Sequence, residues 1–314
     1  MPEKPNLLLA NEFHTDTIEK LDSLYHTHHL WKYSDSEQLD LLDHLQGKCR
    51  AVATGSWACD QIIYKLNSLE LISCFGVGVD AIDFRETNNR GIRVTNTPDV
   101  LNDSVADIAL ALILATTRKI VAADKFVRSG DWLKGPLAFG NGLADKTLGI
   151  IGLGRIGEEI VRRALPFKLK IAYHNRNRKN LAYSYYPSIA ELAANSDILL
   201  CMLPGGELTH KLIDAEIFRN LGPDGVFINV GRGSSVDEEA LVEALQSGQI
   251  FAAGLDVYAR EPNVPEALLS MENVVLLPHI GSATIETREA MGNLLMKNLE
   301  AFFSNIPLLT EVKQ

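Results

Sequence analysis

Short apolar runs alternate with helical patterns along the 314-residue chain. Apolar runs of four to eight residues are typical of buried strands, and apolar positions three or four apart are typical of amphipathic helices. Up to residue 95 the pattern predicts helices over 15–24, 36–46, 58–66 and 81–89 and strands over 6–10, 28–31, 49–54, 71–75 and 93–95. This alternation predicts βαβ units and a parallel sheet.

The alternation resumes after Pro98, which interrupts the pattern. A long apolar helix is predicted over 104–118, with Asp103 or Ser104 as its N-cap. Helices over 189–194 and 237–247 lie among strands predicted over 147–151, 169–174, 197–203, 226–230, 253–257 and 274–277. A last helical pattern, 284–303, has no strand of its own and could pack on either half. We therefore expect an α/β protein with two doubly wound parallel sheets.

A glycine-rich turn follows the apolar run 147–151. Gly152, Gly154 and Gly157 have the GxGxxG spacing, and a helical pattern with acidic residues in its first turn comes next. In this context the glycines allow a tight turn, approach of the backbone to a pyrophosphate and close helix–strand packing. The helix N-terminus offers free N–H groups to the phosphates. The order of strand, glycines and helix therefore predicts a dinucleotide site in the middle of the chain.

Composition narrows the function classes. The chain is 46% hydrophobic and 22% charged, which is typical of a folded protein, and its net charge of −10 argues against a nucleic-acid-binding surface. No secretory signal pattern is present and the longest apolar run, 108–115, is too short to span a bilayer, so we expect a cytoplasmic protein without membrane partners. The four cysteines lack metal-type spacing and are expected to be reduced core residues. The histidines at 26, 28 and 29 are expected on a half-exposed strand, and no metal is predicted.

Three polar residues follow predicted strands at their carboxyl ends, where open α/β sheets bind ligands. They are Arg232, Glu261 and His279. Reduction of a ketone needs a proton donor, and histidine loses its proton near neutrality. A neighbouring carboxylate favours protonated histidine, and arginine can bind a substrate carboxylate with two hydrogen bonds. Each residue could also be an ordinary turn residue, but together they indicate a catalytic site.

The motifs around these residues resemble those of the D-isomer-specific 2-hydroxyacid dehydrogenases. The resemblance covers most of the chain and is carried by FGVGVDAID, VTNTPDVLNDSVADIAL, GIIGLGRIG, NVGRGSSVDEEAL, LDVYAREP and PHIGSAT. Within this family the motifs are most similar to those of NADPH-dependent glyoxylate/hydroxypyruvate reductases, including the hydroxyphenylpyruvate-reductase type. One departure is Lys168, where many relatives have glycine. If that residue is left-handed, a side chain there costs roughly 1 kcal/mol.

The resemblance implies residue roles. Arg232 would bind the substrate carboxylate and polarise the ketone, His279 would be the general acid in reduction, and Glu261 would orient His279. The backbone amides of Val77 and Gly78 would bind the same carboxylate. Asp256 would contact the nicotinamide carboxamide. The full set of implied cofactor contacts is Gly152, Leu153, Gly154, Arg155, Ile156, Gly157, Asn175, Arg176, Arg178, Leu203, Pro204, Val230, Gly231, Asp256, His279 and Gly281.

The resemblance also implies the domain organisation. Residues 1–98, completed by the C-terminal helix 284–314, would form a flavodoxin-like substrate domain, and residues 99–283 a Rossmann cofactor domain. The active cleft would lie between them. Family members usually form homodimers, here through the helix 104–118 and the segment 132–143.

The cofactor preference follows from the end of the strand 169–174. In NAD-binding Rossmann units an acidic residue about twenty residues after the glycines binds the ribose 2′-hydroxyl. Here that position is Asn175, and Arg176, Arg178 and Lys179 follow. Arginine can bind the 2′-phosphate of NADP, which a carboxylate would repel. The sequence therefore predicts NADPH over NADH, although a solvated basic loop is the simpler alternative.

Other functions remain open at this point. The expected reaction is reduction of a small 2-oxo acid of the glyoxylate/hydroxypyruvate class to the D-2-hydroxy acid. An aryl-pyruvate reductase is possible because Trp57 or Trp132 could line an apolar pocket. NAD-linked phosphoglycerate-type dehydrogenases typically carry an acid where Asn175 stands. A nucleotide-sensing co-repressor on the same fold could retain the three catalytic residues, so these alone do not exclude it.

Overall fold

The structure is a computed structural model that describes residues 4–56 and 59–312. The chain divides into two compact units. Unit 1 combines the residues up to Leu101 with those from Thr284 on, and unit 2 comprises Asn102–Ala283. Within the described residues no helix is long and apolar enough to cross a membrane. The roles of the two units as substrate and cofactor domains stay predictions.

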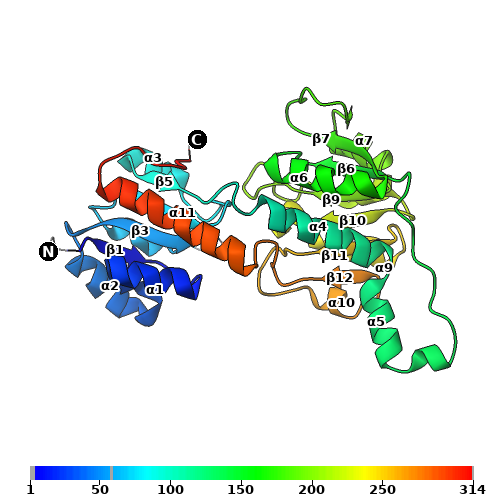
Figure 1. The fold of residues 1–314 in the computed structure, drawn as a ribbon, viewed down its shortest axis with the longest axis horizontal. Coiled ribbons are helices and arrows are strands. Elements are labelled where there is room, and N and C mark those ends of the chain that lie inside the picture. Colours follow the sequence, from blue (N-terminus) through cyan, green and yellow to red (C-terminus); the bar gives the residue numbers. More distant parts are fainter. Residues whose placement is uncertain (1–3, 57–58, 313–314) are drawn as a thin grey trace. The chain divides into compact units, whose positions relative to one another are not determined.

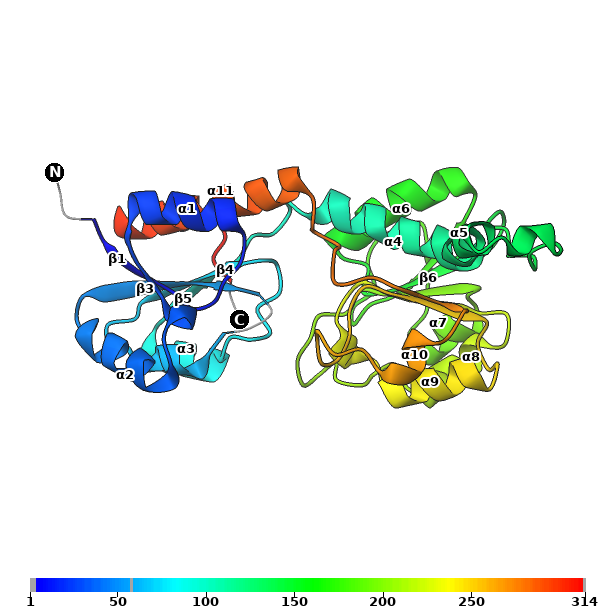
Figure 2. The ribbon, with the colours of Figure 1, turned by 90° about the horizontal axis from the view of Figure 1, so that it is seen from below.

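Unit 1 is a parallel sheet with helices on both faces. Its strand order is β2-β1-β3-β4-β5, and Figure 2 shows α1 and α11 on one face of the sheet and α2 and α3 on the other. The strands are β1 (Asn6–Leu9), β2 (His26–His29), β3 (Cys49–Gly55), β4 (Leu71–Phe75) and β5 (Arg93–Thr95), and the helices are α1 (Thr15–Leu24), α2 (Asp35–His44), α3 (Phe84–Arg90) and α11 (Ile285–Phe303).

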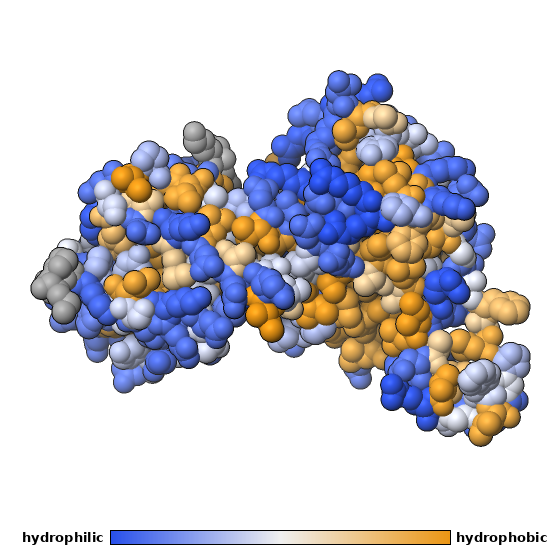
Figure 3. All heavy atoms as spheres, in the orientation of Figure 1, coloured by the Kyte–Doolittle hydropathy of each residue, from blue (hydrophilic) through white to orange (hydrophobic). Residues whose placement is uncertain are grey.

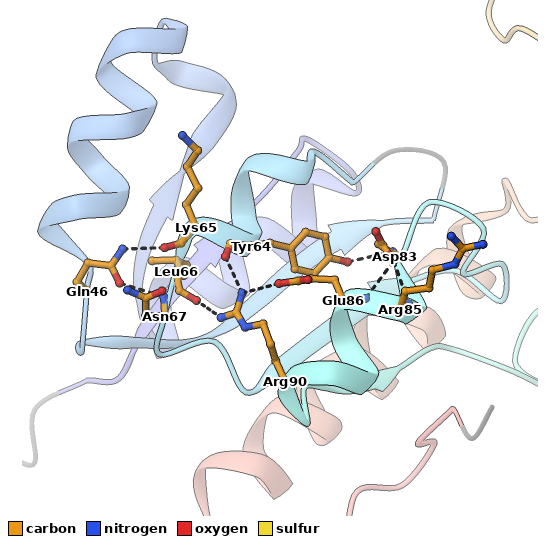
Figure 4. A network of polar contacts seen from close by, with 9 residues as sticks. All are labelled: Gln46, Tyr64, Lys65, Leu66, Asn67, Asp83, Arg85, Glu86 and Arg90. Atoms are coloured by element: carbon orange, nitrogen blue, oxygen red, sulfur yellow. Dashed lines mark hydrogen bonds and ion pairs between the residues drawn. The ribbon is translucent and has the colours of Figure 1, made fainter.

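Polar contacts hold α3 against the segment that precedes β4 (Figure 4). The Arg90 guanidinium donates to the backbone carbonyls of Tyr64, at 2.6 Å, and Leu66. The Tyr64 hydroxyl accepts from the backbone N–H of Asp83, whose carboxylate caps the N-terminus of α3. Arg90 also pairs with Glu86 at 3.4 Å. The guanidinium of Arg90 therefore has its hydrogen-bond acceptors and its carboxylate partner within unit 1.

Unit 2 is a larger parallel sheet with the order β12-β11-β10-β9-β6-β7-β8. Helices α4, α5 and α6 lie on one side and α7 to α10 on the other (Figures 1 and 2). The strands are β6 (Thr147–Ile151), β7 (Lys170–His174), β8 (Ser184–Tyr185), β9 (Ile198–Cys201), β10 (Val226–Asn229), β11 (Ala252–Leu255) and β12 (Val274–Leu276), and the helices are α4 (Asn102–Thr117), α5 (Ile120–Arg128), α6 (Arg155–Ala164), α7 (Ile189–Ala194), α8 (Ala215–Leu221), α9 (Glu238–Gln246) and α10 (Glu266–Leu269).

The predicted fold class is confirmed, because both sheets are parallel and doubly wound. The strand order of unit 2 places β9 between β10 and β6. The chain therefore runs outward from β6 in one direction to β8 and in the other to β12. Such a reversal opens a crevice at the carboxyl ends of the strands beside the reversal point. The glycine turn after β6 lies at that point.

Several local predictions are wrong. The strand predicted over 28–31 is His26–His29, because Leu30 turns into the core and starts a short 3₁₀ helix. The helix predicted over 58–66 is a 3₁₀ helix, Gln61–Lys65, capped by Asp60, and residue 58 lies outside the described residues.

The start of α4 also differs from the prediction. The helix begins at Asn102, so Asp103 lies in its first turn and neither Asp103 nor Ser104 is the N-cap. Asp103 pairs instead with Arg163 of α6 at 2.6 Å, and Asp107 does the same. The predicted buried cysteines and the left-handed backbone of Lys168, with φ of 62°, are confirmed.

Candidate active site

His279 and Glu261 form a close hydrogen-bonded pair in unit 2. Nδ1 of His279 lies 2.6 Å from Oε2 of Glu261, and both side chains are half-buried. Glu261 follows β11 and His279 follows β12, which are adjacent strands of the sheet. Parallel strands end at the same edge, and this brings together two residues that are 18 positions apart. The contact leaves Nε2 of His279 as the ring nitrogen that faces away from Glu261.

Glu261 is held in its ionised form. Its second oxygen, Oε1, accepts from the backbone N–H of Tyr258 at 3.0 Å. Burial alone would raise the pKa of Glu261, but the hydrogen bonds from His279 and Tyr258 and the positive charges of His279 and Arg232 lower it below its usual range. The carboxylate is therefore charged at neutral pH and faces the histidine ring.

The backbone around His279 is fixed by Asp256, the residue that follows β11. The carboxylate of Asp256 accepts from the backbone N–H groups of Ile280 at 2.7 Å and Gly281 at 2.8 Å, and its own carbonyl accepts from the N–H of His279. His279 itself has a left-handed backbone with φ of 54°. Burial raises the pKa of Asp256, although the two backbone hydrogen bonds oppose the shift. Asp256 therefore positions the histidine turn.

Arg232 follows β10, the next strand of the same sheet. Its backbone carbonyl accepts from the side chains of Asn229 at 3.2 Å and Ser235 at 2.7 Å. The neighbouring Gly233 has no room for a side chain, because a Cβ there would lie 1.9 Å from the carbonyl carbon of Tyr258. The turn that carries Arg232 is thereby packed against the segment that carries Glu261.

The arrangement joins a cation, a carboxylate and a histidine at one sheet edge. Strands β10, β11 and β12 lie side by side, and each supplies one of these residues at its carboxyl end. The charge of Arg232 acts on the Glu261 carboxylate. A half-buried guanidinium can bind a carboxylate, and a histidine held by a carboxylate can deliver a proton. Such a set can polarise and protonate a carbonyl group that lies next to a carboxylate.

The glycine turn leads from β6 into α6. Gly152 has φ of 90°, and a Cβ there would lie 3.2 Å from the carbonyl oxygen of Met202. A Cβ at Gly157 would lie 3.0 Å from the side chain of Leu153, which is fully buried. A Cβ at Gly154 would meet nothing within 4 Å, so this glycine borders open space at the N-terminus of α6. The turn therefore fits a dinucleotide pyrophosphate, which needs close approach to the backbone.

Asn175 makes a contact that the sequence analysis did not foresee. Its Oδ1 accepts from the backbone N–H of Leu153 at 2.6 Å, and its Nδ2 donates to the carbonyl of Leu153 at 3.0 Å. The side chain thus fixes the glycine turn at its centre. The N–H of Leu153 already has an acceptor, so a pyrophosphate would use the N–H groups at the start of α6 instead.

The basic residues after Asn175 differ in their surroundings. Lys179 pairs with Glu158 at 2.9 Å, and the Arg178 guanidinium lies 5.8 Å from the centre of the Tyr185 ring. Arg176 is exposed and has no carboxylate at ion-pair distance among the described residues. Arg176 and Arg178 therefore keep their charge available to an anion, whereas Lys179 does not.

Other predicted cofactor contacts gather beside the glycine turn. A Cβ at Gly231 would lie 2.6 Å from the carbonyl oxygen of Leu203, so these two segments touch. Val230 is buried, and Pro204 is exposed. Arg155 and Ile156 begin helix α6, and Gly281 packs against Asp256. Their contacts with a cofactor stay predictions.

The predicted carboxylate-binding amides of Val77 and Gly78 belong to unit 1. They follow β4 and the turn at Gly76, where φ is 146° and a Cβ would lie 2.3 Å from Ser56 Oγ. Asn96 donates to the carbonyl of Val77 at 2.8 Å. Of the two tryptophans considered for an apolar pocket, Trp132 is exposed, and Trp57 lies outside the described residues.

Sequence reasoning missed the residues that support the site. Asn229 and Ser235 hold the turn of Arg232, and Asn229 also accepts from the N–H of Gly231 at 3.0 Å. The sequence does carry a sign of this role, because Asn229 is a polar residue at the end of an otherwise apolar strand. Among the described residues no cluster of three or more His, Cys, Asp or Glu side chains could hold a metal ion.

Comparison with known proteins gives the family. The family described as "D-isomer specific 2-hydroxyacid dehydrogenase, NAD binding domain" matches residues 110–281. The chain belongs to the D-isomer-specific 2-hydroxyacid dehydrogenases. The match includes the glycine turn, Arg232, Glu261 and His279. The resemblance inferred from the sequence motifs is therefore confirmed.

Three similar proteins indicate the class of reaction. The chain is 47% identical over 283 residues to a glyoxylate/hydroxypyruvate reductase A of Arabidopsis thaliana, covering 89% of this chain and 90% of the relative. It is 47% identical over 313 residues to a hydroxyphenylpyruvate reductase of Plectranthus scutellarioides, covering 99% of each. A crystal structure of an NADPH-dependent glyoxylate/hydroxypyruvate reductase from Sinorhizobium meliloti, in complex with NADP and malonate, is 40% identical with a TM-score of 0.90, covering 99% of this chain and 97% of that one. These comparisons support 2-oxo acid reduction.

Proposed function

We propose that this protein uses NADPH to reduce a small 2-oxo acid of the glyoxylate/hydroxypyruvate class to the D-2-hydroxy acid. The observation that carries the proposal is the 2.6 Å contact between His279 and the ionised Glu261, next to Arg232. This set occurs in a member of a family of 2-hydroxyacid dehydrogenases. The relatives named above act on 2-oxo acids by their names.

The proposed chemistry divides between the cofactor and the chain. A bound nicotinamide supplies the hydride to the carbonyl carbon. Arg232 binds the carboxylate of the substrate and polarises the neighbouring carbonyl oxygen. His279 donates a proton from Nε2 to that oxygen, because Nδ1 is held by Glu261. Glu261 keeps the ring oriented and favours its protonated form before the transfer.

In this proposal the substrate carboxylate also accepts hydrogen bonds from two backbone N–H groups. The backbone N–H groups of Val77 and Gly78, which follow β4 in unit 1, donate to it, and so does Arg232. Charge-assisted hydrogen bonds contribute about 1.5–3 kcal/mol each. Ketones and aldehydes without an adjacent carboxylate leave these donors unpaired and are therefore poor substrates.

The preference for NADPH rests on the loop after β7. No acidic side chain stands at residue 175 to bind a ribose 2′-hydroxyl, and Asn175 is engaged with Leu153. Arg176 and Arg178 bind the 2′-phosphate in this proposal. The Sinorhizobium meliloti relative, whose structure contains NADP, supports this preference. NAD-linked phosphoglycerate-type activity is the alternative.

An aryl-pyruvate is the second candidate substrate. The 47% identity to a hydroxyphenylpyruvate reductase over nearly the whole chain favours it. Half-buried Phe13 stacks at 5.2 Å between ring centres on Phe75, which ends β4 and is itself fully buried. Aromatic side chains at this place would suit an aryl group on the substrate.

We also propose that the protein is a homodimer. Helix α5 has no buried residue, and with the following residues up to Leu143 it forms an extended arm (Figure 1). The arm exposes Trp132 by 68%, Leu133 by 95% and Phe139 by 96%. Figure 3 shows apolar side chains on this arm. An apolar surface of this kind is typical of an interface.

One assay tests the proposed function. Nicotinamide absorbance is followed with NADPH and then NADH against glyoxylate, hydroxypyruvate, 4-hydroxyphenylpyruvate and a ketone that lacks a carboxylate. The proposal expects turnover of at least one 2-oxo acid with NADPH and little turnover of the ketone. Binding of NADPH without turnover of any 2-oxo acid would instead indicate a nucleotide sensor.

A further inference from the structure

The exposed stretch 176–178, which carries two arginines, is anchored to the body of unit 2 at both ends. Before the stretch, Asn175 bonds to the backbone of Leu153 at 2.6 and 3.0 Å. After it, the hydroxyl of Tyr173 donates to the carbonyl of Lys179 at 2.9 Å and accepts from the N–H of Lys179 at 3.1 Å. Only three residues lie between these anchors. The arginines therefore belong to a short closed turn, which a loosely solvated basic loop would not form.

Tyr173 is a core residue of β7. Its side chain is fully buried, and its ring lies 5.4 Å from that of Tyr185, its register partner on β8. The pairing of β7 with β8 uses backbone groups and does not need the hydroxyl. A buried phenol needs a hydrogen-bond partner, and here both hydrogen bonds of the hydroxyl go to the backbone of Lys179. The hydroxyl of Tyr173 thus acts on the loop after β7, whereas its ring serves the core.

Two side chains join the same loop to the glycine turn and to helix α6. Lys179 pairs with Glu158, in the first turn of α6, at 2.9 Å. Asn175 binds the middle of the glycine turn through Leu153. All of these residues belong to unit 2, so their placement does not depend on unit 1. The stretch 176–178 is therefore fixed beside the turn and the helix N-terminus that fit the phosphates of a dinucleotide.

The side chain of Arg178 has a restraint of its own. Its guanidinium carbon lies 5.8 Å from the centre of the Tyr185 ring, the same ring that packs on Tyr173. A guanidinium that already rests on an aromatic face loses less freedom when it binds an anion. The backbone on either side of the stretch is also fixed within the fold. Binding an anion here therefore requires little further ordering of the chain.

We propose that Tyr173 is a positioning residue for cofactor preference, because its hydroxyl holds the stretch 176–178 in the shape in which Arg176 and Arg178 bind the 2′-phosphate of NADPH. This inference rests on the proposed function. NADH lacks the 2′-phosphate, so its binding does not use the two arginines. Loss of the Tyr173 hydroxyl therefore weakens NADPH binding and leaves NADH binding nearly unchanged.

The test measures binding of the two cofactors without substrate. Fluorescence of the reduced nicotinamide gives Kd for NADPH and for NADH, and the measured quantity is the ratio of Kd for NADH to Kd for NADPH. Tyr173→Phe lowers this ratio at least about threefold, as expected for the loss of a net hydrogen bond, and keeps Kd for NADH within about twofold. The matched control is Tyr64→Phe, which removes a hydroxyl that accepts from the backbone N–H of Asp83 in unit 1. This control leaves the ratio unchanged.

A second comparison separates positioning from a general loosening of unit 2. In the double variant Arg176→Ala with Arg178→Ala the ratio is low. Adding Tyr173→Phe to this variant lowers the ratio no further, because no arginine remains to be positioned. A hydroxyl that only stabilises the fold would instead weaken both cofactors alike, with or without the two arginines.

The role of Tyr173 is overturned by a smaller fall of the ratio in Tyr173→Phe, by an equal fall in Tyr64→Phe, or by the same fall in the variant without the two arginines. If Tyr173→Phe does not fold, as judged by its thermal melt, hydrogen exchange of the wild type without cofactor decides the matter. The proposal expects the amide of Lys179 to be protected, and exchange as fast as in an unfolded peptide would overturn it. A wild type that binds NADH as tightly as NADPH refutes the proposed cofactor preference itself, whereas a preference that survives in Tyr173→Phe refutes only the role of Tyr173.

Discussion

The side chain of Asn175 forms two hydrogen bonds with the backbone of Leu153, at 2.6 and 3.0 Å. An asparagine can do this because its side chain carries both an acceptor and donors, whereas a carboxylate would have no proton for the carbonyl of Leu153. The residue that stands where NAD-binding relatives carry an acid therefore has a structural task in the glycine turn. This contact links cofactor preference to the shape of the turn.

The first prediction concerns the cofactor. The wild type should favour NADPH over NADH at least about tenfold in kcat/KM, equivalent to about 1.4 kcal/mol. Arg176→Ala should weaken the binding of NADPH much more than the binding of NADH, because only NADPH carries the 2′-phosphate. Asn175→Asp combined with Arg176→Ala should move the preference toward NADH. Arg162→Ala, an exposed arginine of α6 paired with Glu159, is the control. Equal use of both cofactors by the wild type would refute the role of these arginines.

The second prediction concerns proton transfer and substrate binding. His279→Ala should lower kcat about 10²–10⁴-fold, the usual contribution of a general acid. Arg232→Ala should raise KM and lower kcat together, because it binds the carboxylate and polarises the ketone. Steady-state kinetics with NADPH measures both, and His210→Ala, an exposed histidine of unit 2, is the control. Turnover near that of the wild type in either variant would remove that residue from the catalytic set.

The third prediction concerns pH. Reductive kcat/KM should fall as pH rises above neutrality, because imidazolium is the proton donor and histidine ordinarily loses its proton there. The pKa of Glu261 is lowered from its ordinary 4.5, so Glu261 stays ionised across this range and adds no limb of its own. Glu261→Gln should move the basic limb to lower pH, since a carboxylate 2.6 Å from the ring favours imidazolium and its charge is lost.

The pH profile has a matched control in Glu239→Gln, an exposed glutamate of α9. This variant should keep the limb of the wild type. A limb that does not move in Glu261→Gln would show that the carboxylate serves the fold and not the protonation of His279.

The fourth prediction concerns stability. Asp256→Asn leaves one of the N–H groups of Ile280 and Gly281 without its acceptor, because an amide offers a single oxygen. The free energy of unfolding should fall by about 1–3 kcal/mol. Urea unfolding at neutral pH measures it, with Asp224→Asn at an exposed turn as the control. An unchanged urea midpoint would mean that the histidine turn does not depend on Asp256.

The sequence predicts which polar residues gather at one edge of the unit 2 sheet, for a physical reason. Arg232, Glu261 and His279 each follow an apolar run, and in a parallel sheet neighbouring runs end at one edge. The structure places the three strands next to each other and brings His279 to Glu261. Local periodicity and connection rules suffice for such a site because they determine both the strands and their common direction.

Other features depend on packing that local patterns do not encode. Arg288 of α11 lies over the ring of Phe75 only because α11 returns to the sheet of unit 1, 213 residues further along the chain. Asn175 could be placed at the end of β7, but its bonds to Leu153 depend on the shape of a turn 22 residues earlier. Helix α5 lies outside the predicted elements, and none of its residues is buried in the described structure.

The stereochemistry of the product tests the central claim most directly. Hydroxypyruvate is reduced by the wild type with NADPH, and the glycerate formed is resolved by chiral chromatography. The account predicts D-glycerate as the product, since the chain belongs to the D-isomer-specific family. His279 is the proposed proton donor, beside Arg232. Predominantly L-glycerate, or no glycerate at all under conditions where NADPH binds, would contradict the account.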